Sequence, residues 1–219
     1  MSEARGPETG ALAALRAACA RAPDSAVAWF NLGDALERDG GAGSLAEAAD
    51  AYRRAIDADR DFAPPHDRLG QLLLRNGDPA GAAAAFEELS HVQPRFPGVF
   101  LSWGRALAAA GDVEGAMARY RKCAQVDAER EVPALTAWAR LLRERGDLAG
   151  ARGRLAEALH EDPYYFLAHA EEGMCLLAAG EREAGIERLG RALEMIDFAK
   201  DASSERAWIE EALRAARGV

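Results

Sequence analysis

The chain has 219 residues, of which 49% are hydrophobic and 29% are charged, and its formal net charge is −9. This composition allows a sizeable buried core and excludes a largely disordered chain. The negative charge argues against binding to nucleic acid or to an anionic membrane, because both ligands require a positive field.

No secretory signal or membrane span is indicated by the sequence. The first ten residues, MSEARGPETG, contain no apolar run, and no later stretch approaches 18 consecutive apolar residues. We therefore expect a cytoplasmic protein. Cys19, Cys123 and Cys175 are far apart and fall on the apolar sides of helical patterns, which predicts reduced core residues.

In chain order, the patterns predict a lone helix, five helical hairpins of similar sequence and a last helix. The stretch from 100 to 124 shows the hairpin clearly: Phe100, Trp103 and Leu107 share one helical face, and Gly111 and Asp112 interrupt it before a second helix. The expected divisions are a disordered start at 1–8, a lone helix at 9–25, hairpins at 26–62, 63–96, 97–131, 132–165 and 166–199, and a C-terminal capping helix at 200–219.

The hairpins repeat in one register. A small residue in the first helix recurs at intervals of 34 to 37 residues, as Gly33, Gly70, Gly104, Ala139 and Gly173. A small residue in the second helix recurs as Ala48, Ala82, Ala116, Ala151 and Gly185, followed four positions later by Tyr52, Phe86, Tyr120, Leu155 and Leu189. Small residues allow close helix approach, so each pair of columns predicts a hairpin that needs neighbours to cover its apolar face.

Turns and caps complete the pattern. The hairpin turns recur as Gly77-Asp78, Gly111-Asp112, Gly146-Asp147 and Gly180-Glu181. The first hairpin carries three extra residues within 40–44, whose glycines predict a mobile, solvent-facing loop. In the last helix, we expect Ser203 or Ser204 to be the N-cap.

The sequence resembles the tetratricopeptide repeat family, whose repeat follows a W-x2-L-G-x2-Y, A-x3-F, P pattern over 34 residues. Trp29, Leu32 and Gly33 match its opening, and Pro94 and Pro163 stand at its terminal proline. Other proline positions hold Arg60, Ala128 and Asp197, and the first-helix tyrosine is leucine throughout. The resemblance covers residues 11–197 and implies an all-α, right-handed α-solenoid of helix-turn-helix repeats with terminal capping helices.

No catalytic or metal-binding constellation is indicated by the sequence. The histidines, His66, His91, His160 and His169, show no HExxH spacing, and the cysteines form no CxxC pair. His66 and His169 stand in the column of Trp29, which favours packed, partly exposed rings over ligands. We expect neither enzymatic activity nor a cofactor.

In the resembling family the first helices line a concave groove, which we expect to be the binding surface. Residues about one position past the buried columns would line it, namely Phe30, Asn31, Asp34, Asp67, Arg68, Gln71, Arg75, Leu101, Ser102, Arg105, Thr136, Arg140, Arg143, Glu171 and Met174. The arginines Arg68, Arg105 and Arg140, with Arg75 and Arg143 beside them, form a predicted stripe. Two interpretations stay open: the stripe binds an acidic peptide or other carboxylate, or it is a solvated face neutralised by Asp34, Asp67 and Glu144.

The leading hypothesis is a non-catalytic scaffold or adaptor that binds a peptide or protein in this groove. One alternative is a recruitment module that works with an enzyme, since similar arrays precede glycosyltransferase and sulfotransferase domains. The ending of the chain in a polar helix is expected of a finished scaffold. Another alternative is self-assembly through Phe96, Phe100 or Trp208. The partner, its orientation and the oligomeric state are not predicted.

Overall fold

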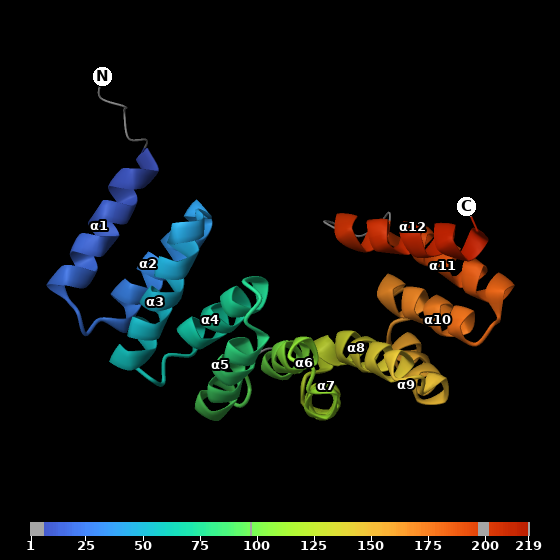
Figure 1. The fold of residues 1–219 in the computed structure, drawn as a ribbon. Helices are drawn as coiled ribbons and strands as arrows, with labels where there is room; N and C mark the ends of the chain where they lie inside the picture. Colours follow the sequence, from blue (N-terminus) through green and yellow to red (C-terminus); the bar gives the residue numbers. More distant parts are fainter. Residues whose placement is uncertain (1–6, 97, 197–201, 219) are drawn as a thin grey trace, which may run out of the picture. The chain divides into compact units, whose positions relative to one another are not determined.

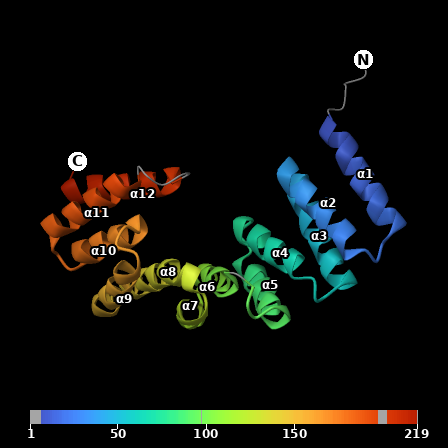
Figure 2. The same cartoon turned by 180° about the vertical axis from the view of Figure 1, so that it is seen from behind.

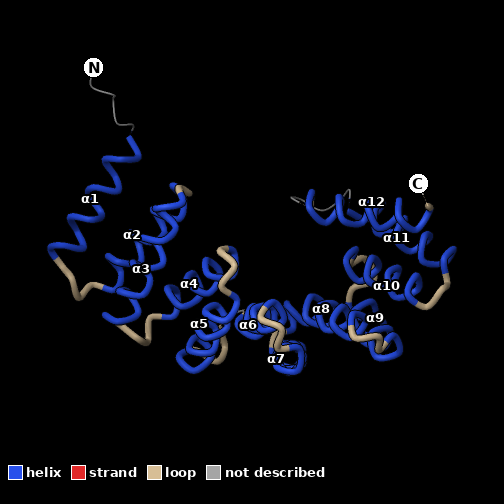
Figure 3. The backbone as a smooth tube through the Cα atoms, in the orientation of Figure 1, coloured by secondary structure: helices blue, strands red, loops and turns tan. Residues whose placement is uncertain are grey.

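The computed structural model describes residues 7–96, 98–196 and 202–218, which form twelve α-helices and one 3-10 helix (Figure 1). Within these ranges the chain consists of helices and the loops that join them, with no strand (Figure 3). The chain divides into two compact units, residues 1–110 and 111–219. The all-α prediction is therefore confirmed, and each unit is an array of helices packed in adjacent pairs.

The first unit contains the lone helix, two complete hairpins and one further helix. Its elements are α1 (Pro7–Arg21), α2 (Ala26–Asp39), α3 (Ala42–Ala58), α4 (Ala63–Arg75), α5 (Pro79–Val92) and α6 (Val99–Ala109). Helices α2 and α3 pack together, as do α4 and α5, and α1 packs on α2. The predicted disordered start lies outside the described residues, except for Pro7 and Glu8, which begin α1.

The second unit continues the same alternation. Its elements are α7 (Val113–Val126), η1 (Ala128–Arg130), α8 (Glu131–Glu144), α9 (Leu148–Glu161), α10 (Phe166–Ala178), α11 (Arg182–Ile196) and α12 (Ser203–Arg217). Helices α8 and α9 pack together, as do α10 and α11, while α12 packs on α11 and α10 (Figures 1 and 2). Helix α10 also contacts α8, so the first helices of these two successive hairpins are neighbours.

The recurring small residues allow a side chain of the second helix to enter the first. A Cβ atom added to Gly33 would lie 2.6 Å from Tyr52 Cε1, and one added to Gly70 would lie 2.7 Å from Phe86 Cζ. Both rings are completely buried. The glycines are therefore required by close packing within the hairpins, not by backbone conformation.

The hairpin turns combine a left-handed glycine with an aspartate cap. At the α4–α5 turn Gly77 has φ +79°, which favours glycine, and the Asp78 carboxylate accepts a hydrogen bond from the Gly81 backbone N–H at 2.9 Å. A Cβ on Gly81 would lie 2.3 Å from Asp78 Oδ2, so a larger residue there would require the Asp78 carboxylate to shift. The same arrangement joins Asp147 to Gly150.

Two local predictions were wrong. The expected loop within 40–44 is reduced to Gly40 and Gly41, because α3 begins at Ala42. The three extra residues lengthen α3 to 17 residues, against 14 in α5 and α9. The N-cap of α12 is Ala202, which provides no side-chain cap, and the Ser204 hydroxyl donates to Glu205 instead.

Side chains of the tryptophan and histidine column bond to the loop before three of the first helices, α2, α4 and α10. Trp29 Nε1 donates to the Pro23 carbonyl at 2.7 Å, while the Nε2 atoms of His66 and His169 lie 3.0 and 2.8 Å from the Arg60 and Pro163 carbonyls. A carbonyl only accepts, so each histidine must carry its hydrogen on Nε2. Both histidines are only 4% exposed, which is more buried than predicted.

The three cysteines lie in the cores, as predicted. Cys19, Cys123 and Cys175 are buried, and none is more than 1% exposed. Burial raises the pKa of Cys175 to about 11, so its thiol is protonated at neutral pH.

Candidate functional site

Most of the predicted groove residues lie partly or fully exposed on first helices of hairpins. Three do not: Leu101, Thr136 and Glu171 are buried, with exposures of 7%, 4% and 0%. Thr136 satisfies its hydroxyl by donating to the Val132 carbonyl at 2.8 Å. Phe30 is half-buried and packs against the rings of Tyr52 and Phe62. Those three buried side chains present no surface to a partner, so the expectation that they line the groove is corrected. The other twelve residues expected there stay candidates, namely Phe30, Asn31, Asp34, Asp67, Arg68, Gln71, Arg75, Ser102, Arg105, Arg140, Arg143 and Met174.

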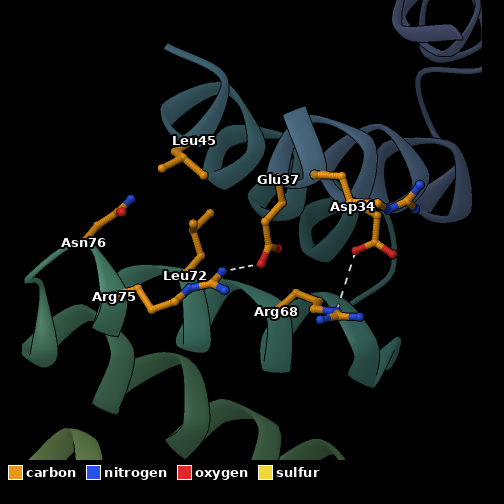
Figure 4. A pocket seen from close by; sticks show the side chains of 8 residues that line it. Asp34, Glu37, Leu45, Arg68, Leu72, Arg75 and Asn76 are labelled. Atoms are coloured by element: carbon orange, nitrogen blue, oxygen red, sulfur yellow. Dashed lines mark hydrogen bonds and ion pairs between the residues drawn. The ribbon is translucent and has the colours of Figure 1, made fainter. Parts of the chain in front are cut away.

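In the first unit, three of the candidate residues, Asp34, Arg68 and Arg75, line a cavity of about 460 Å³, which we call the α2–α4 pocket (Figure 4). Helix α2 contributes one wall, α4 the opposite wall, and Leu45 at the start of α3 closes one end. The lining residues are Asp34, Glu37, Arg38, Leu45, Arg68, Leu72, Arg75 and Asn76.

Two carboxylates of α2 converge on one buried hydroxyl beside this pocket. Tyr52 Oη lies 2.8 Å from both Asp34 Oδ1 and Glu37 Oε2. A phenol has a single hydrogen to donate, so it serves one carboxylate at a time. Burial first, and then these two acidic neighbours, raise the pKa of Tyr52 far above its usual range, so the phenol stays protonated.

Arginines of α4 balance those carboxylates. Arg75 donates to Glu37, and Arg68 Nε lies 3.6 Å from Asp34 Oδ1 (Figure 4). The carboxylates are the deeper groups: Glu37 and Asp34 are 15% and 21% exposed, whereas Arg75 and Arg68 are 58% and 45% exposed. The guanidinium groups thus face solvent and the pocket, with the carboxylates behind them.

Arg38 was missed by the sequence analysis. Its side chain is exposed, lines the pocket and forms no ion pair with any residue that the structure describes. It stands four positions after Asp34, on the same face of α2, and this spacing is the signal that could have found it.

Opposing effects act on the carboxyl groups near the pocket. Burial by itself would raise the pKa of Glu37, but hydrogen bonds from Arg75 and Tyr52 and the charges of Arg75 and Arg68 outweigh it, so the pKa is lowered. At Asp67 burial prevails and raises the pKa, although Gln71 donates a hydrogen bond to it at 2.8 Å.

We expect Glu37 to contribute to stability above its ordinary pKa of 4.5 and to lose that contribution as the pH falls through its lower folded value. The unfolded chain binds the proton first, so acid favours unfolding. Urea denaturation at several pH values should show wild type more stable than Glu37→Gln above about pH 5, with the difference shrinking below it. A difference that grew on acidification would contradict this.

In the second unit the corresponding face is filled by side chains of the protein itself. Arg140 and Arg143 on α8 donate from their Nε atoms to the two carboxylate oxygens of Glu171 on α10. The Trp208 ring of α12 lies against Arg140, with the guanidinium carbon 5.5 Å from the ring centroid. This arrangement explains why Glu171 is completely buried.

The two sets of ion pairs use the same positions with opposite signs. Asp34 and Arg140 each follow the small residue of their helix, and Glu37 and Arg143 come three positions later. Arg68, the partner of Asp34, and Glu171, the partner of Arg140 and Arg143, both stand two positions before the small residue of the next first helix. Glu37 differs, because it pairs with Arg75. In the first unit, acidic residues of α2 pair with basic residues of the next first helix, α4. In the second unit, basic residues of α8 pair with an acidic residue of the next first helix, α10.

The predicted arginine stripe is therefore largely paired within the protein. Arg68, Arg75, Arg140 and Arg143 each have a carboxylate partner, and Arg143 also lies 3.7 Å from Glu144. Arg105 is exposed and has no ion pair among the described residues.

Other types of site have little support in the described part of the chain. No cluster of three or more histidine, cysteine, aspartate or glutamate side chains there could hold a metal ion. No helix in those ranges combines the length and the apolar character that crossing a bilayer requires.

Hairpins that are closely packed at recurring small residues and lie against neighbouring helices define an α-solenoid repeat protein. The profile of the tetratricopeptide repeat matches residues 9–61 and 68–128, more than half of the chain. The chain belongs to the tetratricopeptide repeat family. No curated protein matches it.

Solved structures share the fold at low sequence identity. MamA from Desulfovibrio magneticus RS-1 (residues 41 to the end) matches with a TM-score of 0.66 and 16% identity, covering 80% of this chain and 97% of that one. YrrB, a tetratricopeptide repeat protein with an unusual peptide-binding site, matches with a TM-score of 0.62 and 19% identity over 85% and 94%. Yeast Tom70 matches with a TM-score of 0.65 and 16% identity over 98% and 44%.

Proposed function

We propose that the chain is a non-catalytic, cytoplasmic scaffold or adaptor that binds a peptide or protein segment, and that the α2–α4 pocket is its main binding site. The observation that carries this is a cavity of about 460 Å³ between two successive first helices, with half-exposed arginines on its walls. Pockets of this size accept a few side chains of a ligand.

Family membership supports the same class of function. Proteins built from tetratricopeptide repeats typically bind other proteins and are usually non-catalytic, and YrrB is one with a peptide-binding site. We further propose that the hairpins correspond to five repeats with the boundaries predicted from the sequence. The groove residues of α2, α4 and α6 that are at least partly exposed, including Asn31, Ser102 and Arg105, would extend the binding surface beyond the pocket.

The test is to select peptides from a random displayed library on the full chain and to titrate the recovered peptides against a pocket-blocking variant. Asn76→Trp places a large side chain at the exposed rim of the pocket, at the C-cap of α4. We expect it to weaken binding by about tenfold or more, because the ring would exclude ligand side chains worth at least 1.4 kcal/mol.

Gln93→Trp is the matched control, since Gln93 is exposed at the C-cap of α5 and does not line the pocket. It should bind the selected peptides with wild-type affinity. Selected peptides that bound Asn76→Trp as tightly as wild type would place the site elsewhere, and a library that yielded no binding peptide would contradict the proposed function.

A further inference from the structure

The α2–α4 pocket has more hydrogen-bond donors than the protein uses. A guanidinium group offers five N–H donors. Arg75 donates one hydrogen bond, from Nη2 to Glu37. Arg68 Nε lies 3.6 Å from Asp34 Oδ1, which is an ion-pair distance but too long for a good hydrogen bond. Arg38 has no ion pair among the described residues. The guanidinium groups of the pocket therefore have N–H donors available for the hydrogen-bond acceptors of a ligand.

The net charge of the lining residues also favours an anionic ligand. Three arginines and two carboxylates line the pocket, a formal charge of +1. The carboxylates lie deeper and already accept from Tyr52 and Arg75. A cationic ligand would have to displace these arginines, whereas an anionic one would meet exposed guanidinium groups and make the pocket neutral.

Apolar side chains lie beside the charged ones. Leu45 and Leu72 form the wall next to Arg75, on the side of the pocket where α3 begins (Figure 4). A ligand group with an aliphatic stem and a charged end would contact both parts of the pocket. Glutamate has this form, and a free inorganic anion does not.

We propose that the α2–α4 pocket recognises an acidic side chain of the bound peptide, with its carboxylate held by Arg38, Arg75 and Arg68 and its stem against Leu45. This inference rests on the proposed function and names the ligand chemistry of the same site. Asp34 and Glu37 are positioning residues, because they hold two of the arginines toward the pocket and do not contact the ligand themselves.

The test uses the full chain, labelled with 15N, and two capped tripeptides that differ only in charge, acetyl-Ala-Glu-Ala-amide and acetyl-Ala-Gln-Ala-amide. We expect the glutamate peptide to shift the backbone amide signals of α2 and α4 around the pocket and to bind about tenfold more tightly than the glutamine peptide. Arg38→Gln should remove most of this preference.

Arg60→Gln is the charge-matched control, because Arg60 is exposed, lies outside the pocket and has no ion pair within the described residues. It should keep the preference for glutamate. Inorganic phosphate is the third probe, and it should bind more weakly than the glutamate peptide because it has no stem.

Three outcomes would overturn the inference: equal binding of the two peptides, an unchanged preference in Arg38→Gln, or phosphate binding the pocket more tightly than the glutamate peptide. If Asn76→Trp weakens the binding of displayed peptides but the glutamate and glutamine peptides bind equally, the proposed function stands and only the preference for acidic side chains fails. If Asn76→Trp leaves the affinity for displayed peptides unchanged, the α2–α4 pocket is not the binding site.

Discussion

Phe86→Ala is expected to lower the free energy of unfolding by about 3–5 kcal/mol. The Phe86 ring is completely buried in α5 and packs in a core with Leu89, Val99 and Trp103. Opposite the ring stands Gly70, which has no side chain to fill the space that the substitution would leave. The cavity would thus remain between α4, α5 and α6. Urea denaturation followed by circular dichroism measures the loss.

Tyr164→Ala is the matched control, because it removes an aromatic ring that is 77% exposed. It should change the free energy of unfolding by no more than about 0.5 kcal/mol. A loss of less than about 1 kcal/mol for Phe86→Ala would mean that the ring does not fill the hairpin, and the repeat register built on Gly70 and Phe86 would fail with it.

The second large effect is expected at Glu171, where Glu171→Ala should cost about 3 kcal/mol. The carboxylate is completely buried and accepts hydrogen bonds from Arg140 and Arg143, and Arg143 is itself only 16% exposed. Removing it would leave both guanidinium groups without their shared partner. The loss should fall at the low end of the range for broken buried pairs, because Arg140 is 45% exposed and can be hydrated.

Glu181→Ala provides the comparison, since Glu181 and its partner Arg152 are both about half exposed, at 48% and 51%. An exposed pair of this kind contributes less than about 1 kcal/mol. Chemical denaturation of both variants under the same conditions gives the two values. Equal losses at the two positions would show that Glu171 contributes no more than a surface glutamate.

The hairpins could be predicted from the sequence because their small residues have a direct steric cause. Gly33 and Gly70 are needed where Tyr52 and Phe86 enter the first helix, and this need repeats at nearly constant spacing. The turn before α5 was predictable for a similar reason, since Gly77 adopts a positive φ. Local geometry that recurs leaves a periodic signal in the sequence.

Pairing between helices leaves a weaker signal. Glu171 was expected to face a partner because its position follows the helical period, yet Arg140 and Arg143 bury it from another hairpin. The extra residues after Gly40 were expected to form a loop because they include glycines, but the chain continues them as helix. In both cases contacts or backbone hydrogen bonds formed in the folded chain override local composition.

The opposite signs of the two ion-pair sets bear on how the hairpins select their neighbours during folding. If α2 met α10, Asp34 would face Glu171, and if α8 met α4, Arg140 would face Arg68. Both mispairings bring like charges together and are unfavourable. Hairpins that are nearly interchangeable in shape are thus distinguished by charge, which disfavours exchange of repeats between copies or between distant parts of one chain.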